Sequence, residues 1–443
     1  MNKVIRFITL GCKVNQYETN AMAQKFLEKG YEVIEENNEE SEEKPVACII
    51  NTCTVTNMSD RKSRQMLRRM KEKNPETIVV AVGCYAQVAK EDILKIPEID
   101  LVLGNNEKVK IVEYVEDYIK TNKKILEIED VMQSKEFSDF GNITFSEKTR
   151  AVVKIQDGCD RFCSYCIIPY ARGRVRSRKP ESIISEITKI AGNGIKEVVI
   201  TGIHIASYGK DFTLKKDSDL QNYKLIDLLE EINAIEGIER IRLGSIEPLL
   251  ITDEFVERLK KLEKICHHFH LSLQSGCDET LKRMNRRYTT EQFENIVDIL
   301  RKTYNDVNLT TDIIVGFPGE TEEEFEKTYS FLKKIKFYKM HIFKYSPRKG
   351  TKASVMKNQI PGDIKEERSK RLIELSNKNE HEYNIQYIGK EVDVLFEEEK
   401  VGLYKGHTQN YIMVYCESNE KLDNKIKKVK CKKVIEDHIL AEL

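Results

Sequence analysis

Residues 158–169 read GCDRFCSYCIIP and hold three of the eleven cysteines of the chain. Cys159, Cys163 and Cys166 stand at CxxxCxxC spacing, so one short segment can supply three thiolates to one metal centre. A cubane iron–sulfur cluster normally takes four thiolates, and no nearby cysteine completes this set. The fourth iron is then free for an outside ligand, and the amino and carboxylate groups of S-adenosylmethionine (SAM) can chelate it. We therefore predict a 4Fe–4S cluster with bound SAM at this segment.

The alternative for these cysteines is a structural zinc site or a place in a hydrophobic core. Zinc usually takes four protein ligands, commonly as two CxxC pairs, and no second pair follows Cys166. The spacing therefore favours the cluster. An electron from a reduced cluster can break a carbon–sulfur bond of SAM and release a radical, while the protein orients the substrate and excludes water.

The composition indicates a globular protein with several domains. The chain has 443 residues, of which 40% are hydrophobic and 33% charged, and its formal net charge is +0. These values exclude the disordered and fibrous classes, and the length predicts about three domains. At net neutrality, a nucleic-acid partner has to be held by local basic patches. Because no apolar run suits a signal peptide or a membrane span, we expect a cytoplasmic protein with no membrane partner, in which cysteines serve metal binding.

The residues around the cysteine segment predict repeated β–α units. Helical patterns such as 180–191, 224–235 and 252–263 separate short β-rich runs, which is typical of a partial parallel (β/α) barrel within residues 148–376. The predicted strands are 151–155, 197–201, 240–244, 269–273, 310–315 and 340–345.

The two ends of the chain predict two further domains. In residues 1–130, the apolar runs 4–10, 46–50 and 78–82 each lead into a cysteine, and helical patterns lie at 16–29 and 59–73. This alternation predicts a Rossmann-like parallel α/β domain, whose ligands gather beyond the carboxyl ends of the strands. A Glu-rich loop at 35–43 and a linker at 131–147 interrupt the pattern. After a charged helix at about 363–384, residues 377–443 predict a small antiparallel β-barrel.

A family resemblance adds to this interpretation. The cysteine motif, together with TLGCKVNQYET at 9–19, resembles the methylthiotransferases, a branch of the radical SAM superfamily, over essentially the whole chain. The resemblance implies that the terminal barrel is a TRAM domain and that Cys12, Cys53 and Cys84 hold a second 4Fe–4S cluster. From the residues alone, only convergence is expected, since all three cysteines follow strands of one sheet. The family's chemistry uses two SAM molecules per product, one to methylate a cluster-bound sulfur and one to generate the radical.

The resemblance also implies contacts to SAM or substrate at the strand ends and in the cysteine segment, although each residue could instead cap a helix or satisfy a turn. Thr201 and Gly202 stand where many radical SAM enzymes have a GGE turn, and this chain departs from that wording. The candidate contacts are Tyr165, Thr201, Gly202, His204, Ser245, Glu247, Gln274, Ser275, Asp312, Tyr345 and Arg348.

The wording TLGCKVNQYET and YARGRVRSR most resembles the subgroup that acts on threonylcarbamoyladenosine next to the tRNA anticodon. The resemblance therefore implies tRNA as partner, together with a flavodoxin-like or ferredoxin-like electron donor. Basic segments suit phosphate and base contacts, and they predict RNA binding by Arg68, Arg69, Arg172, Arg174, Arg176, Arg178, Lys427, Lys428 and Lys430. Open alternatives are isopentenyladenosine in tRNA, a ribosomal-protein aspartate, or a noncatalytic iron–sulfur protein that binds RNA or senses redox state.

Overall fold

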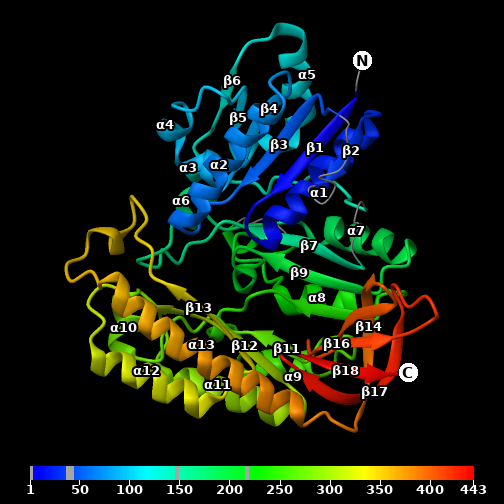
Figure 1. The fold of residues 1–443 in the computed structure, drawn as a ribbon, viewed down its shortest axis with the longest axis vertical. Coiled ribbons are helices and arrows are strands. Elements are labelled where there is room, and N and C mark those ends of the chain that lie inside the picture. The colour runs from blue at the N-terminus through cyan, green and yellow to red at the C-terminus, as the bar shows by residue number, and fades with distance from the viewer. Residues whose placement is uncertain (1–2, 36–43, 145–148, 215–218) are drawn as a thin grey trace.

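The computed structural model describes residues 3–35, 44–144, 149–214 and 219–443 (Figure 1). An N-terminal domain lies above an open barrel, and a small closed β-barrel packs beside the lower part. Apart from residue 35, the Glu-rich segment expected at 35–43 lies outside the described residues, as do residues 145–147 of the expected linker. Within the described ranges, no helix is both long and apolar enough to span a membrane.

The N-terminal domain is built on a six-stranded parallel sheet in the order β2-β1-β3-β4-β5-β6. The central strands β3 (Ala47–Thr52) and β4 (Ile78–Gly83) are buried along their whole length, since helices cover both faces. Their side chains alternate, so Ile49 and Val80 enter one hydrophobic cluster while Ile50 and Val79 enter the other. The remaining elements are β1 (Val4–Thr9), α1 (Lys13–Glu28), β2 (Glu32–Glu35), α2 (Asn57–Lys73), α3 (Cys84–Val88), α4 (Lys90–Ile93), β5 (Leu101–Leu103), α5 (Ile111–Thr121) and β6 (Ile125–Glu127).

The middle of the chain forms an open barrel of two sheets, ordered β10-β9-β7-β8 and β11-β12-β13. A parallel bridge between Ile246 and Leu271 joins the two sheets. The strands are β7 (Arg150–Asp157), β8 (Arg176–Ser177), β9 (Glu197–Gly202), β10 (Arg240–Leu243), β11 (His268–His270), β12 (Asn308–Val315) and β13 (Lys339–Lys344). The helices are α6 (Ile168–Arg172), α7 (Pro180–Gly192), α8 (Leu225–Asn233), α9 (Asp253–Leu259), α10 (Asp278–Arg283), α11 (Thr290–Thr303) and α12 (Glu322–Ile335).

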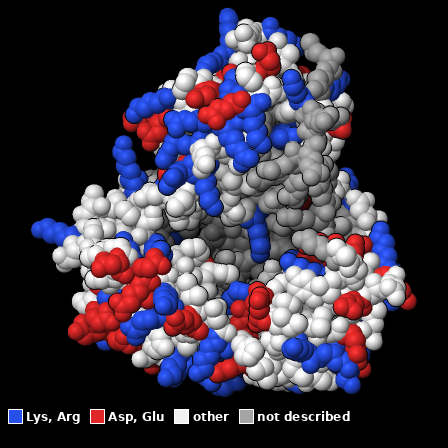
Figure 2. Space-filling view, in the orientation of Figure 1, with Lys and Arg blue, Asp and Glu red and all other residues white. Residues whose placement is uncertain are grey.

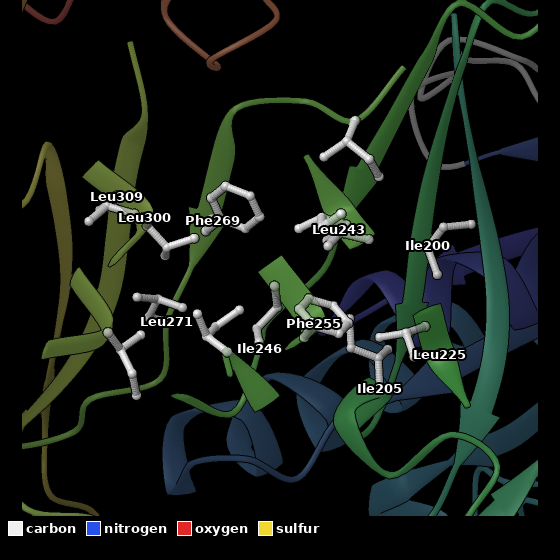
Figure 3. Packing of buried hydrophobic residues seen from close by; sticks show 14 of the residues in the cluster. Ile200, Ile205, Leu225, Leu243, Ile246, Phe255, Phe269, Leu271, Leu300 and Leu309 are labelled. Atoms are coloured by element: carbon white, nitrogen blue, oxygen red, sulfur yellow. The ribbon is translucent and has the colours of Figure 1, made fainter. Parts of the chain in front are cut away.

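One hydrophobic cluster fills the space between the barrel strands and their helices (Figure 3). Ile200 of β9 and Leu243 of β10 face Leu225 and Phe255 of the covering helices, and Phe269 and Leu309 extend the cluster to the second sheet. This core fixes the strand ends, which carry the candidate site. The predicted α/β fold with a partial barrel is confirmed, whereas the short antiparallel strand β8 was not predicted.

The C-terminal region begins with the long helix α13 (Gly362–Ile385) and ends in a closed five-stranded barrel. The barrel strands are β14 (Glu391–Lys400), β15 (Leu403–Thr408), β16 (Met413–Glu417), β17 (Ile426–Ile435) and β18 (His438–Glu442). The predicted small barrel is confirmed, and all its pairs are antiparallel except β16 with β18. Helix α13 packs along β13, where Ser376 accepts a hydrogen bond from the Met340 backbone (2.9 Å), so the domain boundary predicted at 376 falls inside a helix.

Candidate cluster and cofactor site

The cysteine segment leaves the end of β7 and turns sharply into the barrel mouth. Gly158 makes this turn possible, because it has a φ of +72° and a Cβ there would lie 1.8 Å from the Arg174 carbonyl oxygen. The loop then brings Cys159, Cys163 and Cys166 to the wall of one cavity of about 910 Å³. All three thiols are free, so one loop presents three sulfur ligands to one space.

Donors aimed at these sulfurs fit a thiolate-bound cluster. The Arg286 guanidinium donates to Cys163 Sγ (3.4 Å), and the Arg161 backbone N–H donates to Cys159 Sγ (3.4 Å). Such bonds stabilise the negative charge of metal-bound thiolates. Arg286 comes from the loop after α10, and sequence reasoning missed it because nothing local links it to the cysteines.

Glu247 is the centre of a charged network on the cavity wall beside the cysteines. It accepts bonds from His204 Nε2 (3.3 Å) and Arg286 (3.2 Å), and Arg161 lies 3.9 Å away. Burial alone would raise the pKa of Glu247, but the His204 hydrogen bond and the two guanidinium charges lower it to about 2. Glu247 is therefore ionised near neutral pH, where it can orient Arg286 toward Cys163.

Most of the candidate SAM or substrate contacts line this cavity. Those on its wall are Tyr165, Thr201, Gly202, His204, Ser245, Glu247, Gln274 and Asp312. Gln274 has a φ of +71°, and its backbone bonds to Asp312 and Ile314 hold this strained turn at the barrel mouth. These assignments stay predictions, now with a shared location.

Three of the expected contacts, Ser275, Tyr345 and Arg348, do not line the cavity. Ser275 is fully buried and bonds to Thr328 behind the wall (3.3 Å). Tyr345 packs in a separate hydrophobic cluster that supports Tyr165 from outside the cavity. Arg348 reaches the N-terminal domain, where its guanidinium contacts Asp60 (2.6 Å) and Thr54 (2.6 Å). Arg348 therefore joins two domains.

The second cysteine set lies at the carboxyl ends of three adjacent parallel strands. Cys12 follows β1, Cys53 follows β3 and Cys84 follows β4, as the strand pattern predicted. Gly11 is required for this convergence, since a Cβ on it would lie 2.8 Å from Cys53 Sγ. Cys12 also lines the 910 Å³ cavity. Of the second set, Cys12 therefore reaches the space that Cys159, Cys163 and Cys166 line, while Cys53 and Cys84 are buried.

A buried charge network surrounds the second set. The Glu18 carboxylate pairs with Arg172 (2.5 Å), Lys108 (2.5 Å) and Lys154 (2.7 Å), and Asp157 also pairs with Lys154 (2.5 Å). In addition, Arg172 Nε donates to Cys84 Sγ (3.3 Å), and within the described residues Glu18 and Asp157 are the two carboxylates paired with these cations. A surplus of buried cations beside a thiol fits an anionic, thiolate-bound cluster at Cys84.

The arginines that follow the cysteine segment need a correction as RNA contacts. Arg172, Arg176 and Arg178 are buried, with at most 1% of each residue's surface exposed. Arg178 pairs with Glu186 (2.8 Å) and donates to the hydroxyl of Tyr17 in the N-terminal domain (3.1 Å), so it stabilises the junction between domains. Gly173, with a φ of +75°, turns the backbone between Arg172 and Arg174. Of the four arginines in this segment, Arg174 is the exposed one.

The other predicted RNA contacts lie on the surface. Arg68 and Arg69 are exposed on α2, near the loop that carries Cys53, and Lys427, Lys428 and Lys430 lie on β17. Figure 2 shows Lys and Arg side chains gathered over the N-terminal domain, above a hollow in the middle of this face. These residues remain predicted contacts to RNA.

The cavity also carries a polar wall, of which only Asp312 was assigned from the sequence. His270 Nε2 lies 3.1 Å from Asp312 Oδ2, and the ligand atoms of His270, Asp312 and His341 all lie within 4.8 Å of one another. Thr310 bonds to both His268 and His270 (3.0 Å each). The HHFH wording at 267–270 was a signal for part of this wall, but Asp312 and His341 come from other strands.

Comparisons with known proteins agree with this site. Residues 153–332 match the model of the radical SAM superfamily, and residues 4–104 match that of the uncharacterized protein family UPF0004. The threonylcarbamoyladenosine tRNA methylthiotransferase MtaB of Bacillus subtilis is 41% identical over 96% of this chain and 93% of its own length. The chain belongs to the radical SAM methylthiotransferase family.

Two further comparisons concern a second tRNA-modifying relative and a solved structure. A tRNA-2-methylthio-N(6)-dimethylallyladenosine synthase of Caldicellulosiruptor saccharolyticus is 38% identical over 97% of this chain and 87% of its own length. Among solved structures, the radical SAM methyltransferase TsrM of Kitasatospora setae superposes with a TM-score of 0.58, covering 80% of this chain and 74% of that one. At 15% identity, this likeness supports the fold alone. SAM and 4Fe–4S clusters are the cofactors of the family, and both cysteine sets fit clusters.

Proposed function

We propose that this enzyme adds a methylthio group to carbon 2 of threonylcarbamoyladenosine, next to the anticodon of tRNA. The single observation that carries the proposal is the shared cavity, which is lined by Cys159, Cys163 and Cys166 of the first set and by Cys12 of the second. Sulfur insertion at an unactivated aromatic carbon requires a radical source and a sulfur source at one substrate. The relatives named for threonylcarbamoyladenosine include proteins at 41% and 42% identity, which supports this substrate.

Each set of residues has a proposed role. Cys159, Cys163 and Cys166 hold the SAM-binding cluster, and Cys12, Cys53 and Cys84 hold the second one. When bound, the two clusters and two SAM molecules per product supply the radical, the sulfur and the methyl group.

The chain's own side chains position these groups and exclude water. Glu247 keeps Arg286 on Cys163, while the side chain of Tyr165 is held against Phe317 (6.5 Å between ring centres) on the cavity wall. Arg172 on Cys84 stabilises negative charge at the second set. A flavodoxin-like or ferredoxin-like protein is the proposed electron donor.

Cysteine variants test the division of labour. With reduced, reconstituted enzyme, Cys163→Ala should abolish 5′-deoxyadenosine formation, because the SAM-binding cluster loses a ligand. Cys53→Ala should keep 5′-deoxyadenosine and lose the methylthio product. Cys48→Ala is the matched control, since Cys48 lies in the buried strand that leads to Cys53 and should keep both products. Methylthio product from Cys53→Ala at the unaltered rate would contradict the proposal.

The substrate is tested separately, since a relative at 38% identity is named for dimethylallyladenosine. Mass spectrometry of tRNA nucleosides from cells that lack the gene should reveal loss of the methylthio derivative of threonylcarbamoyladenosine. Loss of the isopentenyladenosine derivative instead would assign the second substrate. Intact levels of both would contradict a role in tRNA.

A further inference from the structure

We propose that Lys13 and Tyr411 form an anion site that binds the carboxylate of the threonyl group and so selects the substrate. This inference rests on the proposed function and deepens it. Both residues line the 910 Å³ cavity, although they are 398 positions apart and come from the first and last domains. An isopentenyl group has no charge, so a cationic end of the cavity distinguishes the two modified adenosines.

Lys13 is the cation that lacks a partner. It is the first residue of α1, and within the described residues its ammonium group makes no hydrogen bond or ion pair. The other lysine at this end, Lys339, is paired with Glu380 (2.9 Å). Asp312 is likewise held by His270 (3.1 Å). An unpaired lysine on the wall of the cavity leaves a charge with which an anionic ligand can pair.

Tyr411 is held rigidly at the same end by the loop between β15 and β16. His407 stacks on its ring (4.6 Å between ring centres), and His268 stacks on it as well (4.8 Å). The Arg242 guanidinium lies 4.6 Å from the ring centre. The backbone of Tyr411 has a φ of +70°, a conformation that a bulky residue adopts only when its surroundings impose it.

The floor beneath Tyr411 has an excess of positive charge. Arg150, Arg240 and Arg242 gather there, and within the described residues the carboxylates paired with them are Glu397 (2.8 Å from Arg150) and Glu197 (2.7 Å from Arg242), while the exposed Asp393 also acts on Arg240. His268 and His407, which stack on Tyr411, supply no negative charge to balance the guanidinium groups. Burial raises the pKa of the Tyr411 hydroxyl, but Arg150, Lys13 and Arg242 outweigh it and lower that pKa below its ordinary value. A carboxylate is therefore favoured at this end of the cavity.

The position of this end suits the substrate. Carbon 2 of the base has to lie within reach of both cysteine sets, and four of these cysteines, Cys12, Cys159, Cys163 and Cys166, line the same cavity as Tyr411. The threonyl group on N6 then extends toward the wall formed by the terminal barrel. Arg240 and Arg242 fix that barrel by donating to the His407 (2.9 Å) and Gln409 (3.1 Å) carbonyl oxygens, so Tyr411 cannot drift from the site.

The test compares anticodon stem-loops that carry threonylcarbamoyladenosine or its neutral methyl ester. We expect kcat/KM and equilibrium affinity at fixed salt to favour the acid by about 10- to 100-fold, the range of one charge-assisted hydrogen bond. Lys13→Met and Tyr411→Phe should each reduce this preference to within about threefold. The reduction should come from lower kcat/KM and affinity for the acid, while the values for the ester stay unchanged. Lys13→Arg should keep the preference, because it keeps the cation.

Two controls separate recognition from structural damage. Tyr415→Phe removes a hydroxyl from the same small barrel outside the cavity and should leave the preference unchanged. Because Cys12 is adjacent to Lys13, the iron content of each Lys13 variant shows if its cluster is intact. If the Lys13 variants lose iron, the result for Tyr411→Phe decides the test. Equal use of acid and ester by the unaltered enzyme would overturn the anion site and leave the proposed function standing. Activity on an isopentenyladenosine stem-loop alone would overturn both.

Discussion

Replacing Glu18 with Gln tests the charge network that joins the first two domains. Glu18 is 1% exposed, and its two oxygens contact Arg172 (2.5 and 3.0 Å), Lys108 (2.5 Å) and Lys154 (2.7 Å). Glutamine keeps the shape and removes the charge, which leaves three buried cations with Asp157 as their main counter-charge. Removing one partner from a buried ion pair costs about 3–5 kcal/mol.

The assay is thermal unfolding of the variant beside a surface control. At about 2 °C per kcal/mol for a large domain, Glu18→Gln should lower the first unfolding midpoint by about 6–10 °C. Glu239→Gln removes the partner of Lys196 (2.7 Å), where both side chains are about a third or more exposed, and it should cost at most about 1 kcal/mol. A midpoint for Glu18→Gln within about 2 °C of the control would refute the reasoning.

The pH dependence provides a second check. Burial raises the pKa of Glu18, but Arg172, Lys108 and Lys154 together hold it well below its ordinary value. A carboxyl with a depressed pKa in the folded state stabilises fully above its unfolded pKa of about 4.3, and this contribution is lost as the pH falls through the folded value. The difference in unfolding midpoint between the unaltered protein and Glu18→Gln should be constant from about pH 6 to 8 and disappear only at acidic pH. A difference that changes between pH 6 and 8 would contradict the assignment.

Two further predictions concern the α2 surface and the domain contact beneath it. Reversing Arg68 and Arg69 to Glu should weaken tRNA binding and reduce the slope of its salt dependence by about one to two units. Reversing the exposed Lys260 and Lys261 on the outer barrel should change neither quantity. A salt titration measures both variants, and unchanged binding by the α2 variant would remove that helix from the interface. Arg348→Met should speed hydrogen exchange at residues 54–60, because it breaks a buried pair with Asp60 (2.6 Å) at a cost of about 3 kcal/mol. Arg371→Met is the control, since it removes the more exposed pair with Glu326 and should leave that exchange unchanged.

The strands and the cysteine segment could be predicted because their signals are local. Apolar runs at 46–50 and 78–82 form central strands whatever the rest of the chain does, and a parallel sheet brings their carboxyl ends together. Cys53 and Cys84 are 31 positions apart, a spacing with no meaning by itself. Their convergence followed from the topology, whereas their role as ligands needed the family resemblance.

The surroundings of charged side chains could not be predicted in the same way. Arg172 and Arg174 are two positions apart in one cationic run, yet the first is buried on Cys84 and the second is exposed. The difference depends on which carboxylates the N-terminal domain brings to Arg172, and Glu18 is 154 positions away. Lys13 and Tyr411 were missed for the same reason, since no local pattern links them.

The neutral net charge of the chain conceals two places where cations outnumber the carboxylates that pair with them among the described residues. At the first, Arg172, Lys108, Lys154 and Arg176 surround Glu18 and Asp157; at the second, Lys13, Arg150, Arg240 and Arg242 surround Glu197 and Glu397. Unbalanced buried charge is costly, so each surplus implies an anionic occupant. Thiols border the first place, which suits a metal cluster bound by thiolates. A tyrosine hydroxyl and a free ammonium border the second, which suits a carboxylate. The same electrostatic reasoning thus assigns a cofactor to the first place and substrate selection to the second.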